Sequence, residues 1–159
     1  MDVSKMKKVS GIVCIVLMLL VLLVQFWPGF FPFNTINAET MQAETGEASI
    51  AQVVWMPKTF KDAYNQHFKV ANVSENMMAF APAVQWLLTL FGIFLLVKCP
   101  KISAMGIFPI LVGLVGIAGY LSVEAFRTHW SWYISIALAV LCVLGGLFYI
   151  VKDKILKEA

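Results

Sequence analysis

Charged residues are scarce in this sequence. Only 13% of its 159 residues carry a formal charge, whereas 60% are hydrophobic, and the mean hydropathy is +0.83. A soluble domain is closer to half apolar and a quarter charged, and a core of this size cannot bury so large an apolar excess. The composition therefore excludes a soluble enzyme, a disordered chain and a nucleic-acid-binding domain, and it indicates a protein whose solvent is a lipid bilayer.

Motifs of catalysis and of metal or cofactor binding are absent as well. The sequence contains no glycine-rich nucleotide loop, nucleophile elbow, zinc-protease motif or paired carboxylates. Its three cysteines, Cys14, Cys99 and Cys142, have neither zinc-binding nor redox spacing, and none lies in the water-facing segment 28–76 that disulfides would staple. We therefore expect a non-enzymatic protein without catalytic, cofactor-binding or metal-binding residues.

Four apolar stretches are long enough to cross a bilayer as helices. Each approaches the roughly 20 residues that span about 30 Å of hydrocarbon, and none has a charged residue in its middle. Backbone groups in lipid must bond to one another, which favours helices. We predict transmembrane helices at 9–27, 77–97, 102–123 and 130–151, joined by the outer segment 28–76, a cytoplasmic turn at 98–101 and an outer link at 124–129. The predicted fold is an all-α integral membrane protein, an antiparallel four-helix bundle.

Basic residues are distributed unevenly around these helices. Eight of the twelve Lys and Arg residues fall in 1–8, 98–101 or 152–159, whereas six of the nine acidic residues fall in 28–76 or 124–129. Loops rich in Lys and Arg stay in the cytoplasm. Both termini are therefore predicted to be cytoplasmic, in a plasma membrane that we take to be a bacterial inner membrane. The first stretch begins like a signal peptide but lacks a well-placed cleavage site, so we expect it to be retained.

One part of the outer segment has the spacing of an amphipathic helix. Across 59–70, aromatic residues recur at every fourth position, namely Phe60, Tyr64 and Phe68, and Thr59 can cap the helix. Such a helix would lie on the outer membrane surface, or its aromatic face would dock a partner protein. Both interpretations stay open.

The outer segment before this helix has a different character. The stretch 34–52 is polar and acidic, which is typical of a mobile loop or a loosely held helix. Val53, Val54 and Trp55 precede a Met-Pro pair and are predicted to be extended, ending at a turn. Trp55 is also a candidate contact to a partner.

Small residues recur at helical spacing in the third and fourth predicted helices. They are Gly113, Gly116 and Gly119 in the third and Ser131, Ser135 and Ala139 in the fourth. Such faces let helices approach closely in lipid. They would pack against each other within the bundle or against another subunit.

Polar residues gather at the outer ends of the predicted helices. The candidate cluster comprises Gln85, Tyr120, Glu124 and Arg127. Glu124 and Arg127 are three residues apart and can form an ion pair on a helix, either at headgroup level or at the mouth of a small site. Ion and proton pathways usually carry acids, His or Arg in mid-membrane, and these helices have none, which argues against a pump.

Three functional hypotheses follow. The leading one is a non-enzymatic accessory or scaffold subunit of a larger membrane complex, most plausibly a transporter assembly, whose partners are the bilayer and other membrane subunits or further copies of the chain. The alternative is a small homo-oligomeric channel or carrier with Gln25, Gln85, Tyr120 and Glu124 near its entrance. The third is an enzyme acting on lipid, with His67, His129 and Glu124 meeting at the outer interface.

Overall fold

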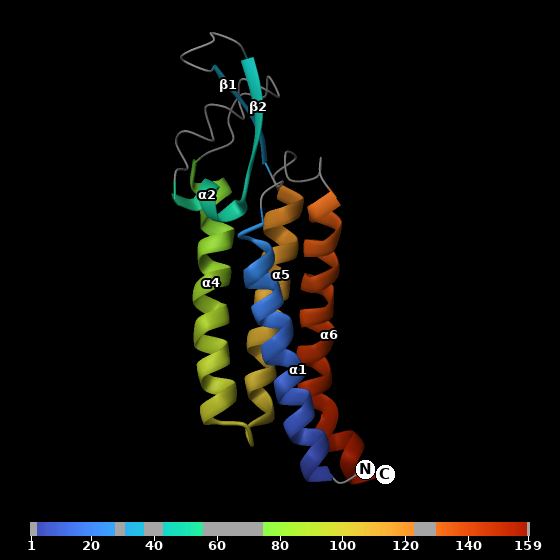
Figure 1. Ribbon diagram of the computed structural model, residues 1–159. Coiled ribbons are helices and arrows are strands. Elements are labelled where there is room, and N and C mark those ends of the chain that lie inside the picture. The colour runs from blue at the N-terminus through green and yellow to red at the C-terminus, as the bar shows by residue number, and fades with distance from the viewer. Residues whose placement is uncertain (1–2, 28–30, 37–42, 56–74, 123–129, 159) are drawn as a thin grey trace.

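The computed structural model describes residues 3–27, 31–36, 43–55, 75–122 and 130–158. Within these ranges, four long helices run side by side (Figure 1). They are α1 (Val3–Val24), α4 (Glu75–Lys98), α5 (Ile107–Ser122), which the 3₁₀-helix η1 (Ser103–Gly106) precedes, and α6 (Trp130–Glu158). Helices α4 and α6 each pack against both α1 and α5, so the four form a closed bundle with antiparallel neighbours.

Hydropathy and length bear out the membrane character of this bundle. Among the described residues, three helical stretches are long and apolar enough to cross a membrane: Phe80–Lys98, Ser103–Leu121 and Ser131–Lys152. The apolar part of α1, Lys8–Val24, is shorter. The helical nature of the predicted membrane stretches is thus confirmed.

Helices α5 and α6 touch through their backbones. A Cβ atom at Gly106 would lie 2.6 Å from the carbonyl oxygen of Gly146, and a Cβ at Gly146 would lie 2.5 Å from that of Gly106. Seven residues after Gly106 and seven residues before Gly146, a Cβ at Gly113 would collide with the carbonyl oxygen of Ala139. Small residues at both levels therefore permit the close approach of the two helices.

The interior is apolar through most of the length of the bundle. Its central cluster consists of Cys14, Met18, Val21, Leu96, Val112, Cys142 and Tyr149. The Cys14 thiol donates a hydrogen bond to the carbonyl oxygen of Gly145 at 3.4 Å, which ties α1 to α6. Both buried cysteines thus act as small packing residues.

A β-hairpin rises from the end of the bundle opposite the two termini (Figure 1). Strands β1 (Phe31–Ile36) and β2 (Ala43–Ala48) pair antiparallel, with Phe31 opposite Ala48 and Ile36 opposite Ala43. We call this end of the bundle the outer end and the end that carries the termini the inner end, after the predicted orientation. The hairpin is an addition to the predicted architecture, in a stretch that the sequence indicated to be a loop or a loose helix.

The short helix α2 (Ile50–Trp55) follows the hairpin. Its start is a capping box. Ser49 Oγ accepts a hydrogen bond from the backbone N–H of Gln52 at 3.2 Å, and Gln52 Oε1 accepts one from the backbone N–H of Ser49 at 2.8 Å. The prediction that Val53, Val54 and Trp55 are extended is therefore wrong. The predicted helix 59–70, with Phe60, Tyr64 and Phe68, lies outside the described residues.

Candidate functional site

Polar side chains from three helices meet in the interior near the outer end of the bundle. Gln25 follows the last turn of α1, Gln85 lies in α4 and Tyr120 in α5, and their exposed fractions are 0%, 2% and 2%. With Trp86 they form a set that we call the outer polar network. Buried polar groups need hydrogen-bond partners, so the bonding of this network decides its role.

The carboxamide of Gln25 is the centre of the outer polar network. Its oxygen accepts a hydrogen bond from the indole N–H of Trp86. Its nitrogen donates to Gln85 Oε1 and to the Tyr120 hydroxyl, the latter at 3.2 Å. An indole nitrogen can only donate, and this fixes which end of the Gln25 amide is the oxygen. Both amide protons and the oxygen of Gln25 are thus bonded within the protein.

Gln85 continues the network into α5. Its nitrogen donates to the backbone carbonyl oxygen of Val112 at 2.9 Å. A Cβ atom at Gly116 would collide with that same Gln85 nitrogen. Because Gly116 lies four residues after Val112, its missing side chain opens the path by which the Gln85 amide reaches the helix backbone. Gly116 therefore makes room for the Gln85 side chain, in addition to allowing close helix packing.

Two residues of α6 extend the network on the far side of Tyr120. The Tyr120 hydroxyl is hydrogen bonded to the side chain of Ser135, and Ser135 Oγ donates to the carbonyl oxygen of Ser131 at 2.9 Å. The indole N–H of Trp132 donates to the carbonyl oxygen of Tyr120 at 3.1 Å. Helices α4, α5 and α6 and the turn that follows α1 consequently contribute to one connected set of hydrogen bonds.

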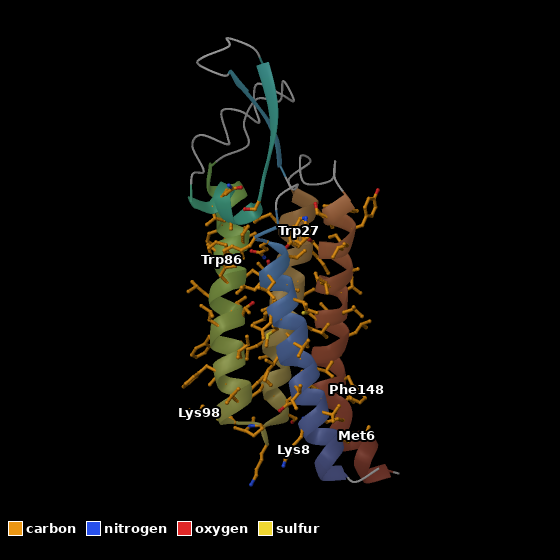
Figure 2. All side chains as sticks on the ribbon, in the orientation of Figure 1. Met6, Lys8, Trp27, Trp86, Lys98 and Phe148 are labelled. Carbon is orange, nitrogen blue, oxygen red and sulfur yellow. The ribbon has the colours of Figure 1, made fainter. Side chains whose placement is uncertain are left out.

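The same region connects the bundle to the outer segment. The backbone N–H of Ala51, in the first turn of α2, donates to the carbonyl oxygen of Gln25 at 3.0 Å. Ile50 and Ala51 are buried, and α2 packs on α4. Phe26 stacks on Trp86 with ring centres 5.8 Å apart, and Figure 2 shows Trp86 and Trp27 together at this end. Gln25 thus joins α2 through its backbone and the bundle through its side chain.

The structure brings together some of the site residues predicted from the sequence and separates others. Gln25, Gln85 and Tyr120 come together. Glu124, Arg127, His67 and His129 lie outside the described residues. Trp55 is the last residue of α2. The glycines separate: Gly113 faces α6, whereas Gly116 and Gly119 face Gln85 and Ala81 of α4. Ser131 and Ser135 belong to the polar network, and Ala139 packs opposite Gly113.

Sequence reasoning missed Trp86 and the carbonyl of Val112. The position of Trp86 directly after Gln85 was the available signal, since an indole near a membrane interface seeks a partner for its N–H.

The chemistry of this site is that of neutral hydrogen bonds. Its described members are two carboxamides, two indoles, a phenol and serine hydroxyl groups, and none of them is a carboxylate or an amine. The pocket beside Gln85 and Tyr120 has a volume of about 10 Å³, close to the minimum that holds one water molecule. Among the described residues no three His, Cys, Asp or Glu side chains gather as metal ligands.

The inner end holds a buried cation. Lys152, predicted as the first residue of the cytoplasmic C-terminus, is 2% exposed, and α6 continues past it to Glu158. Its ammonium group lies 3.0 Å from the centre of the Tyr149 ring, a favourable cation–π arrangement. The Tyr149 hydroxyl in turn donates to the carbonyl oxygen of Pro100 at 2.8 Å. Lys152 is therefore buried at the inner end of the bundle.

Comparison with protein-family models, with curated proteins and with solved structures finds no match for this chain.

Proposed function

We propose that this chain is a scaffold subunit of a larger membrane complex, whose bundle holds the outer segment Phe31–Trp55 in position for a partner protein. In this proposal α1 spans the membrane beside the other three helices. Its apolar part, Lys8–Val24, is near the lower limit of about 17 residues for a span. Both termini lie in the cytoplasm, as the distribution of Lys predicts, and a bacterial transporter assembly is the host that we favour.

The observation that carries the proposal is the double attachment at Gln25. A bundle that served only as an anchor would not need its buried polar groups to contact an outer helix. Here the backbone of Gln25 accepts the Ala51 bond, while its side chain bonds Gln85 and Tyr120. The outer segment is thereby connected to three helices at one point, which reduces the conformational entropy lost when a partner binds.

The small residues at helical spacing support a partner contact through the outer segment, because their own contacts lie within the bundle. Gly113 and Ala139 pack against each other, and Gly116 accommodates Gln85, so these residues are used inside the bundle. The hairpin, by contrast, is a two-stranded sheet, a kind of structure that is marginal in water without further packing. A partner that adds a strand or covers a face would supply that packing.

Native mass spectrometry of the protein extracted from its own membrane in mild detergent tests the proposal. We expect a species heavier than the 17.7 kDa chain, with a second component in constant ratio. The variant Ser49→Ala removes the cap of α2 and should lower the recovery of that component while the bundle stays folded. The matched control is Ser103→Ala, at the inner end. Recovery of a lone monomer under all extraction conditions would overturn the proposal.

A flux assay separates the scaffold from the alternative channel or carrier. The pocket beside the outer polar network has room for about one water molecule, which gives no support to a passage through a single bundle. Liposomes containing only this chain should therefore show no flux above protein-free liposomes. Saturable flux that Gln85→Leu abolishes would replace the scaffold with the channel or carrier.

A further inference from the structure

A groove lies between α1 and α6 at the inner end of the bundle, far from the outer polar network. Its volume is about 240 Å³. Its walls are Met6, Val9, Ser10 and Val13 of α1 and Gly145 and Phe148 of α6. On α1 these residues are spaced i, i+3, i+4 and i+7, which places them on one helix face. The absence of a side chain at Gly145 deepens the groove.

The lining of this groove selects an apolar occupant. Among its described lining residues Ser10 is the only polar one, and that residue is buried at 5% exposure. Apolar cavities of about 150 Å³ stay dry and bind small hydrocarbons. A groove of this character in the wall of a membrane protein opens toward lipid, so an acyl chain is the occupant of matching chemistry.

Positive charge lies at the end of the groove. Lys152 follows Gly145 and Phe148 by seven and four residues, so all three share one face of α6. Its ammonium group is buried against Tyr149, where a charge acts over a longer range than it does in water. Lys8 is exposed on the same turn of α1, but it follows Met6 by two residues and therefore lies on a different face from the lining residues, whereas Figure 2 shows Met6 and Phe148 at the inner end.

We propose that this groove binds one acyl chain of an anionic phospholipid from the cytoplasmic leaflet, with the phosphate held at headgroup level by the field of Lys152. The apolar lining provides affinity for the chain, and the cation provides preference for a negative headgroup. The inference requires the membrane insertion of the bundle but does not depend on a protein partner at the outer end.

Lipid titration followed by native mass spectrometry tests this site. The purified chain is titrated with phosphatidylglycerol and with phosphatidylcholine of identical acyl chains. We expect one phosphatidylglycerol to bind more tightly than the later ones and more tightly than phosphatidylcholine. Glycerophosphoglycerol, the same headgroup without acyl chains, should not compete. Competition by that headgroup alone, or equal binding of the two lipids, would overturn the proposal.

Two sets of variants locate the site. Val13→Phe fills the groove and should weaken the binding of both lipids, whereas Val16→Phe, on the same helix and with the same 46% exposure, should not. Lys152→Gln should lower the preference for phosphatidylglycerol about fivefold without weakening the binding of phosphatidylcholine, whereas Lys8→Gln, on a different face of α1, should leave that preference unchanged. Equal lipid binding in the two valine variants contradicts the site. A dimer that Val13→Phe dissociates would replace the lipid with a second copy of the chain.

Discussion

Gln25 and Gln85 are separated by sixty residues in the chain, and their side chains bond to each other in the interior between α1 and α4. The whole outer segment lies between them in the sequence. The bond therefore closes a long loop at its base, and the same Gln25 amide also reaches Trp86 and Tyr120. This one contact determines the register of α1 against α4 and the position from which the outer segment departs.

Removal of the Gln25 side chain should destabilise the bundle. Gln25→Leu leaves the Trp86 N–H and the Gln85 oxygen buried without their partner, which costs about 1–3 kcal/mol of unfolding free energy. Unfolding in a mixed-micelle denaturant series measures this. The lipid-facing control Leu23→Ala, at 60% exposure, should change stability by less than about 0.5 kcal/mol. If the double variant Gln25→Leu/Gln85→Leu costs the full sum of the single variants, the two residues are not coupled.

Gly116 should tolerate no side chain while Gln85 is present. In Gly116→Ala the new methyl group meets the Gln85 amide, and overpacking of this kind costs about 1–3 kcal/mol. Gly11→Ala is the control, because its Cβ would lie at an ordinary 3.6 Å from the Tyr149 ring. In the background of Gln85→Ala the cost of Gly116→Ala should largely disappear. A cost that persists undiminished there would show that Gly116 serves some contact other than the amide of Gln85.

Adjacent glycines in α6 should respond differently to the same substitution. Gly146→Ala places a methyl group against the carbonyl oxygen of Gly106, a backbone atom of a packed helix, and should lower stability by about 2–3 kcal/mol. Gly145→Ala places its methyl group 3.2 Å from the tip of Leu17, a flexible side chain, and should be nearly neutral. The midpoints of thermal unfolding in detergent compare the two. Equal losses would contradict the backbone contact between α5 and α6.

Thr89→Val should stabilise the protein. The hydroxyl of Thr89 is buried and has no hydrogen-bond partner among the described residues, so a side chain of the same shape without the hydroxyl removes an unfavourable burial. The expected gain is about 1 kcal/mol. Ser135→Ala is the contrasting case, because Ser135 donates to Ser131, and it should lose stability. If Thr89→Val instead lowers the stability measured in the same denaturant series, the Thr89 hydroxyl is hydrogen bonded in the membrane and the expectation is wrong.

The helical bundle could be predicted because lipid imposes strong rules on a sequence. Long uncharged stretches leave few alternatives to helices, and Gln85 and Tyr120 are conspicuous as polar residues within them. Their meeting with Gln25 could not be predicted, since it depends on the rotation of each helix about its axis. Hydrophobic periodicity says little about that rotation when a helix is apolar on every side.

The structure of the outer segment was harder to predict, because the rules that lipid imposes on a sequence do not apply to a water-facing segment. The sequence of β2, Ala-Glu-Thr-Gly-Glu-Ala, has little intrinsic preference for a strand, so its pairing with β1 is a tertiary effect. The start of α2 was available in the sequence, because Ser49 and Gln52 have the spacing of a capping box. The burial of Lys152 could not be predicted, because a lysine near a chain end resembles a topology signal and only its packing against Tyr149 reveals the burial.

The Gln25–Gln85 bond also has a consequence for a chain that has been cut. Both ends of the connection between α1 and α4 are held at a single buried point, and α1 further packs on α6 along the bundle. Proteolytic nicking anywhere between Ser49 and Gln85 would therefore yield two fragments that remain one particle in the membrane, the N-terminal of which still carries the hairpin. Loss of an intact band on a denaturing gel would not, for this protein, mean loss of its assembly.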